Sequence, residues 1–156
     1  MNTQLVISLD KARELYPKAS SELKVILDET FGKNNLKSNV TERVKSVQDA
    51  CYELRISYVD FITSLRGLSP DTYAYECLKM ITKALNGEWK VDYLDKTQQR
   101  WFPRFTLSSS GFAFLAASYI YSYPSAGGAS RLLFKNKETA EYAGKKFIDL
   151  YRVYLT

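Results

Sequence analysis

One stretch decides how the chain on either side of it is interpreted: Ser69-Pro-Asp-Thr-Tyr-Ala-Tyr-Glu-Cys-Leu-Lys-Met-Ile-Thr-Lys-Ala-Leu-Asn-Gly87. Ser69 is a favourable N-cap, Pro70 suits the first helical turn, and Gly87 is a typical helix stop. Between these ends, apolar residues recur at three- and four-residue spacing: Ala74, Cys77, Leu78, Ile81, Ala84 and Leu85. The stretch therefore predicts one amphipathic helix with an apolar face turned to a core.

The chain before this helix carries further helix signals. Ser8 predicts the cap of a short helix that Pro17 ends early, and Ser20 or Ser21 predicts the cap of a second helix that stops at Gly32. A third apolar stripe follows at helical spacing: Val40, Val44, Val47, Cys51 and Leu54.

Two weaker signals complete this helical part. Ser46 and Asp49 resemble a capping box with Asp in place of Glu, which predicts that a helix begins at Val47. Residues 58–65 form a weaker helix candidate.

The character of the sequence changes after Gly87. Of the 22 aromatic residues, 15 lie beyond this point, in segments whose residue types favour strands. The expected strands cover residues 89–93, 100–107, 112–115, 118–123 and 131–134, with turns at 108–111 and 124–128. Asn136 predicts the cap of a helix from Lys137 to about Tyr154. We expect a three- or four-stranded antiparallel sheet covered by this helix.

These patterns predict an α+β protein, with an N-terminal helical part followed by a small antiparallel sheet packed on a C-terminal helix. The helical subdomain is expected to cover residues 1–86, and the aromatic-rich sheet and last helix residues 87–156. No linker separates them, so we expect one compact unit.

The composition excludes much of enzyme chemistry. Histidine is absent, which removes Ser-His-Asp and Cys-His catalysis and the common histidine-bearing zinc sites. Cys51 and Cys77 lie too far apart for a CxxC motif and are expected to be buried thiols in a reducing compartment. Asp92 and Asp95 fit salt bridges or turn hydrogen bonds better than a metal site. We expect no enzymatic activity, no cofactor and no metal.

The basic residues are unevenly distributed. Residues 1–86 carry 12 basic and 11 acidic side chains, whereas residues 87–156 carry 10 basic and 6 acidic ones. No acid occurs between Asp95 and Glu138, although six Lys and Arg residues lie there. A surface without compensating acids suits a polyanionic partner.

Aromatic and basic side chains in this segment suggest a surface for single-stranded nucleic acid, where rings stack on bases and cations follow phosphates. The alternatives are that the tyrosines face the C-terminal helix and that the basic residues form an ordinary solvated face. Two paired strands would align the basic residues in a stripe. The candidate nucleic-acid-binding residues are Lys90, Arg100, Trp101, Arg104, Tyr119, Tyr121, Tyr123, Arg131 and Lys135.

Two segments in the last third of the chain resemble a known group of proteins: Ser130-Arg-Leu-Leu-Phe-Lys135 and Glu138-Thr-Ala-Glu-Tyr-Ala-Gly-Lys-Lys-Phe-Ile-Asp-Leu-Tyr151. With Leu85-Asn-Gly-x-Trp89 and Trp101-Phe-Pro103, they resemble a module of uncharacterised proteins from bacteriophages and prophages of Bacteroides-type gut bacteria. Ser46-Val-Gln-Asp-Ala-Cys-Tyr-Glu-Leu54 resembles the first half of such proteins. The resemblance implies a phage-related origin and no particular chemistry.

The leading hypothesis is a non-enzymatic, phage-encoded accessory protein that binds single-stranded or flexible DNA through its C-terminal sheet. The alternative is a virion-structural or protein-interaction component that uses the same aromatic and Arg surface, as a homo-oligomer or with a phage or host protein. No signal peptide and no apolar run long enough to cross a bilayer is evident. We expect a location in the host cytoplasm or on the virion, and no membrane partner.

Overall fold

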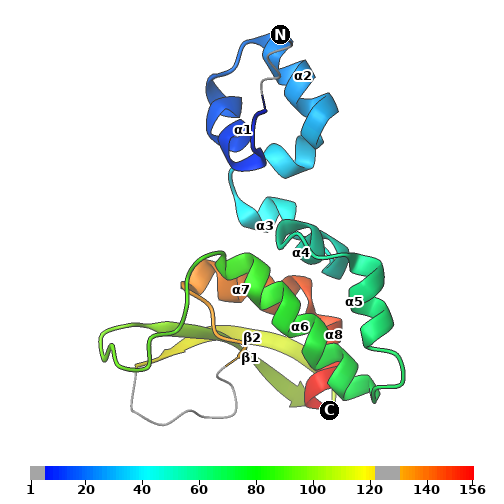
Figure 1. The fold of residues 1–156 in the computed structure, drawn as a ribbon. Helices are drawn as coiled ribbons and strands as arrows, with labels where there is room; N and C mark the ends of the chain where they lie inside the picture. The colour runs from blue at the N-terminus through cyan, green and yellow to red at the C-terminus, as the bar shows by residue number, and fades with distance from the viewer. Residues whose placement is uncertain (1–5, 122–130) are drawn as a thin grey trace. The chain divides into compact units, whose positions relative to one another are not determined.

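The computed structural model describes residues 6–121 and 131–156, and the chain forms two compact units (Figure 1). The first unit ends at Arg43 and the second begins at Val44. This division differs from the boundary expected near Asn86, because the helix that ends there packs against the C-terminal helix and so belongs with the sheet.

The first unit is a small helical cluster. It contains α1 (Leu9–Leu15), the 3-10 turn η1 (Tyr16–Lys18), α2 (Ser21–Phe31), η2 (Lys33–Leu36) and α3 (Val40–Arg43). Ser8 and Ser20 cap α1 and α2 by accepting backbone N–H groups through their hydroxyls, as predicted. The buried core consists of Ala12, Leu27 and Leu36.

Three helices open the second unit. They are α4 (Val47–Glu53), α5 (Tyr58–Ser64) and α6 (Pro70–Asn86). Ser46 caps α4 through the N–H of Asp49, and the Asp49 carboxylate accepts the N–H of Lys45, which confirms the predicted helix start. The apolar face of α6 is buried as expected, and Cys51 and Cys77 are buried free thiols.

The sheet is smaller than expected. Within the described residues it has two antiparallel strands, β1 (Arg100–Ser108) and β2 (Gly111–Ile120), with a register shift between Arg104 and Phe105. The prediction of a strand over residues 89–93 is wrong, because that segment is an irregular loop.

The prediction of a strand over residues 131–134 is also wrong, since a single bridge joins this segment to β1. Trp101 and Phe134 exchange both backbone hydrogen bonds, at 2.9 and 2.7 Å. The next hydrogen-bonded pair of an antiparallel ladder lies two residues along, where β1 has Pro103. Because proline has no N–H, the ladder cannot continue there.

Two helices complete the unit: α7 (Lys137–Lys146), which Asn136 caps, and α8 (Ile148–Leu155). They replace the single helix expected to about Tyr154, with a break at Phe147. Helix α7 packs on both strands and α8 packs on α6, so the sheet lies on the C-terminal helices of an α+β fold, as predicted. No helix among residues 6–121 and 131–156 is long and apolar enough to cross a membrane.

Candidate functional site

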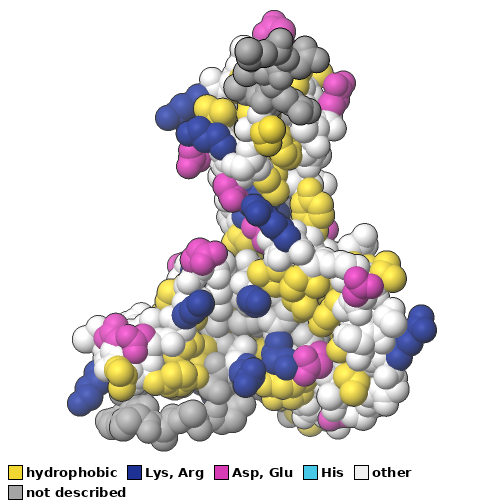
Figure 2. Space-filling view, viewed as in Figure 1, with side chains coloured by type: hydrophobic (Ala, Val, Ile, Leu, Met, Phe, Trp, Pro, Cys, Tyr) yellow, Lys and Arg dark blue, Asp and Glu magenta, His cyan; other side chains and the backbone are white. Residues whose placement is uncertain are grey.

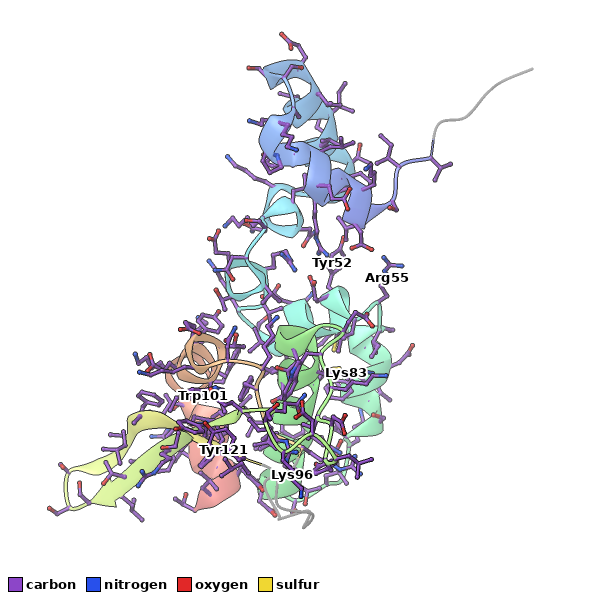
Figure 3. The ribbon with its side chains drawn as sticks, turned by 90° about the vertical axis from the view of Figure 1, so that its left-hand side faces the viewer. Tyr52, Arg55, Lys83, Lys96, Trp101 and Tyr121 are labelled. Carbon is purple, nitrogen blue, oxygen red and sulfur yellow. The ribbon has the colours of Figure 1, made fainter. Side chains whose placement is uncertain are left out.

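Three aromatic side chains, which we call the aromatic cluster, meet where β1 begins and β2 ends: Trp101, Tyr119 and Tyr121. Trp101 lies opposite Tyr119 across the two strands, and their ring centroids are 4.8 Å apart. The ring of Tyr121 meets that of Tyr119 edge to face at 5.2 Å. In Figure 3, Trp101 and Tyr121 both lie toward the end of the hairpin away from its turn.

The two tyrosines of the cluster are accessible. Tyr119 is 45% exposed and Tyr121 48% exposed. Tyr119 is hydrogen-bonded to Tyr121, which raises the pKa of the Tyr119 phenol, and Gln99 Nε2 donates to the Tyr121 hydroxyl at 3.1 Å. These rings therefore do not face the C-terminal helix as buried core residues. Tyr123 and the turn over residues 124–128 lie outside the described residues.

Arg100 does not belong to an exposed basic surface, contrary to expectation. Its side chain is buried, and its Nη2 donates to the carbonyl oxygen of Asp92 at 2.8 Å. The guanidinium also lies 4.7 Å from the centroid of the Tyr93 ring. Because its partners come from the preceding loop, Arg100 anchors that loop on the sheet.

The predicted basic stripe does not form. Arg104 is exposed, but strand alternation puts it on the face opposite Trp101. Lys135 is exposed in a bend, and Arg131 lies in a turn, so neither belongs to a strand paired with β1.

Lys90 and Arg131 instead come together at an open cavity of about 240 Å³ beside the end of α6, which we call the basic cavity. Two lysines that are not among the candidate residues, Lys79 and Lys83, also line it. Their four-residue spacing places them on one side of α6, but nothing local indicates that Arg131 faces them. The full lining comprises Lys79, Thr82, Lys83, Asn86, Gly87, Trp89, Lys90, Val91, Arg131 and Leu133.

Figure 2 shows several Lys and Arg side chains, in dark blue, gathered on the face of α6 turned to the viewer. Figure 3 labels Lys83 on α6 and, lower in the view, Lys96 on the loop that follows this helix. Trp101, Tyr119 and Tyr121 do not line the basic cavity, so the aromatic cluster and the basic cavity are two separate features of the second unit.

The acidic candidates have structural roles. Asp92 Oδ1 accepts the N–H of Leu94 at 2.9 Å, and Asp95 Oδ1 accepts the N–H and the hydroxyl of Thr97 at 2.8 and 2.7 Å. These bonds lower the pKa of Asp95. The described part of the chain contains no group of three or more side chains suited to hold a metal ion.

Comparisons with known proteins give no further guide to the site. No family model matches the chain, and neither a curated protein nor a solved structure matches it significantly.

Proposed function

We propose that this protein binds single-stranded nucleic acid, with the aromatic cluster stacking on bases and exposed cations contacting phosphates. The observation that carries the proposal is the exposure of Tyr119 and Tyr121, in a segment where no acid occurs between Asp95 and Glu138. Proteins that bind single strands combine such aromatic faces with a cationic surface. The resemblance to bacteriophage proteins supports a phage-encoded accessory protein of the host cytoplasm, and the lack of histidine supports a non-enzymatic role.

The exposed cations give this proposal a measurable signature. Lys90, Arg104, Arg131 and Lys135 are all exposed, whereas the buried Arg100 is not expected to contribute. Each phosphate of a single strand that a cation neutralises adds about −0.7 to the slope of log affinity against log salt. We therefore expect binding that weakens log-linearly as salt rises.

The test is fluorescence anisotropy of labelled single- and double-stranded oligonucleotides of equal length, titrated with the protein at several salt concentrations. Tyr119→Ala and Tyr121→Ala should each weaken single-strand binding, because a stacked base contributes about 1–3 kcal/mol. Tyr52→Ala is the matched control, since Tyr52 is 49% exposed on α4, outside the cluster. Undetectable binding at low salt, or an equal loss in Tyr52→Ala, would refute the proposal.

The edge of the sheet favours a second candidate function, a protein interface. Strand β2 carries no charged side chain, and within the described residues it pairs only with β1. Leu115 and Ile120 are 54% and 44% exposed. Unpaired strand edges of this kind add strands from other chains. Light scattering that finds a stable, salt-insensitive oligomer, together with no binding to oligonucleotides, would favour this function.

A further inference from the structure

The lining of the basic cavity carries an excess of positive charge that neighbouring acidic side chains do not neutralise. Four cationic side chains and no acidic one line it. Lys79 pairs with Glu76, whose Oε1 lies 2.6 Å from Nζ. Lys83, Lys90 and Arg131 form no ion pair within the described residues, and neither residues 1–5 nor residues 122–130 contain Asp or Glu.

The end of α6 offsets only part of this charge. A helix C-terminus carries a partial charge of about −0.5, so it favours a lysine such as Lys83 in the last turn. That partial charge is too small to balance three cations. Lys90 and Arg131 lie beyond the helix, and the helix dipole does not account for their position.

Hydrogen bonds hold the walls of the cavity in place. Asn86 joins α6 to the segment after Arg131 through Leu133, as its Nδ2 donates to the Leu133 carbonyl oxygen at 2.8 Å. On the other wall, Gln98 Nε2 donates to the carbonyl oxygen of Lys90 at 3.2 Å, and Gln98 Oε1 accepts the N–H of Asp92 at 2.9 Å. The backbones that carry the cations are therefore positioned before any ligand binds, which reduces the entropic cost of binding.

The other walls indicate what kind of anion fits. Trp89 contributes a half-buried aromatic surface, and Thr82 has a buried hydroxyl without a hydrogen-bond partner within the described residues. The cavity volume of about 240 Å³ is below the range of roughly 300–1,000 Å³ typical of ligand pockets. A small, doubly charged group attached to a flat or apolar one suits these walls better than a chain passing through.

We propose that the basic cavity binds a phosphate monoester, with Lys83, Lys90 and Arg131 around the phosphate and Trp89 beside the group that carries it. Such a phosphate is the end of a nucleic-acid strand or part of a free mononucleotide. This inference deepens the proposed function when the phosphate ends a strand, and it rests on separate residues from the aromatic cluster.

The experiment compares labelled single strands that carry a 5′-phosphate with identical strands that carry a 5′-hydroxyl, by anisotropy. Adenosine 5′-monophosphate, adenosine and inorganic phosphate are titrated separately by calorimetry. The proposal expects at least a tenfold preference for the 5′-phosphate strand, or binding of the monophosphate without binding of adenosine. The first result identifies a strand end as the ligand, and the second a free nucleotide.

Variants assign the preference to the cavity. Lys83→Gln and Arg131→Gln should abolish the preference for the 5′-phosphate. Lys96→Gln should retain the preference, because Lys96 is exposed on the same loop as Lys90 but does not line the cavity. Circular dichroism checks that each variant is folded. Both variants replace exposed side chains, so loss of folding is not expected.

The failures of the two proposals are distinguishable. Strands that bind without a 5′-phosphate preference, together with no binding of the monophosphate, would overturn the cavity site and leave the aromatic cluster as the nucleic-acid surface. Monophosphate binding that Lys83→Gln abolishes, in a protein that binds no strand, would uphold the cavity site and refute the proposed function. A preference that survives in both Lys83→Gln and Arg131→Gln would also overturn the cavity site.

Discussion

The carboxamide of Asn86 donates to the carbonyl oxygen of Leu133 at 2.8 Å and so joins the end of α6 to the segment that leads into α7. The same side chain accepts the N–H of Lys135 at its Oδ1, at 3.1 Å. One buried amide thus satisfies a carbonyl and an amide of a segment that Pro103 prevents from forming a regular strand. This arrangement sets the wall of the basic cavity on which Arg131 lies.

Replacing Asn86 by alanine should destabilise the second unit by about 2–4 kcal/mol. The substitution leaves the buried Leu133 carbonyl without its partner, which costs about 1–3 kcal/mol, and removes a part-buried hydrogen bond to the Lys135 N–H, which adds about 1 kcal/mol. Urea unfolding followed by circular dichroism measures the change. Ser109→Ala, at the exposed hairpin turn, is the control and should change stability by less than about 0.5 kcal/mol. Equal stability of Asn86→Ala and wild type would show that the two bonds contribute nothing net.

Gly144→Ala should lower stability by about 1–3 kcal/mol, because α7 approaches the sheet too closely at this residue to admit a side chain. A Cβ at this position would lie 2.6 Å from Cβ of Pro103 and 2.7 Å from Cδ2 of Phe114. Overpacking of this size forces backbone or rotamer shifts. Thermal unfolding measures the loss, with the exposed Lys146→Ala in the same helix as the control. A stabilised Gly144→Ala would mean that helix propensity outweighs the steric conflict.

The helices of this protein could be predicted because their signals are local. Ser8, Ser20 and Ser46 each cap a helix within three residues of their own position, and Gly87 ends α6 where the sequence indicates. The strands could be predicted only in part. Residue types after Gly87 favour strands, but the pairing of residues 131–134 depends on Pro103 in another segment, and no local pattern shows that conflict.

The candidate site, like the strands, could be predicted only in part. The exposed pair Tyr119 and Tyr121 follows from alternation near the end of a strand, although their exposure depends on where the helices pack. Arg100 looks like a surface cation in the sequence, yet its loop folds back to bury it. The basic cavity brings Lys83 together with Arg131 through tertiary packing, and this proximity has no local sequence signal.

Thr82→Val should stabilise the protein by about 1 kcal/mol and raise its melting temperature by about 2–4 °C. The Thr82 hydroxyl is buried without a partner in the described part of the chain, and valine replaces it with a methyl group of similar shape. Both residues are β-branched, so helix propensity changes little. Lower stability in Thr82→Val would show that the hydroxyl has a water partner.

Tyr151→Phe should stabilise the protein at neutral pH and reduce its loss of stability at alkaline pH. The Tyr151 ring packs 4.8 Å from Phe105, and its buried hydroxyl has no hydrogen-bond partner within the described residues. Burial, with a smaller effect from Tyr154, raises the pKa of Tyr151 well above its ordinary value. In the unfolded chain this phenol ionises near pH 10, so above that pH the unfolded state binds fewer protons than the native state. The stability that the neutral phenol contributes is therefore present below about pH 10 and is lost as the pH rises further. Tyr151→Phe removes this pH dependence because phenylalanine does not ionise.

Urea unfolding at neutral pH and above about pH 10 measures the gain in stability and the smaller alkaline loss. The control Tyr52→Phe, which replaces an exposed tyrosine, should change neither. An unchanged alkaline loss in Tyr151→Phe would assign it to other tyrosines, such as the half-buried Tyr142, whose pKa is also raised by desolvation.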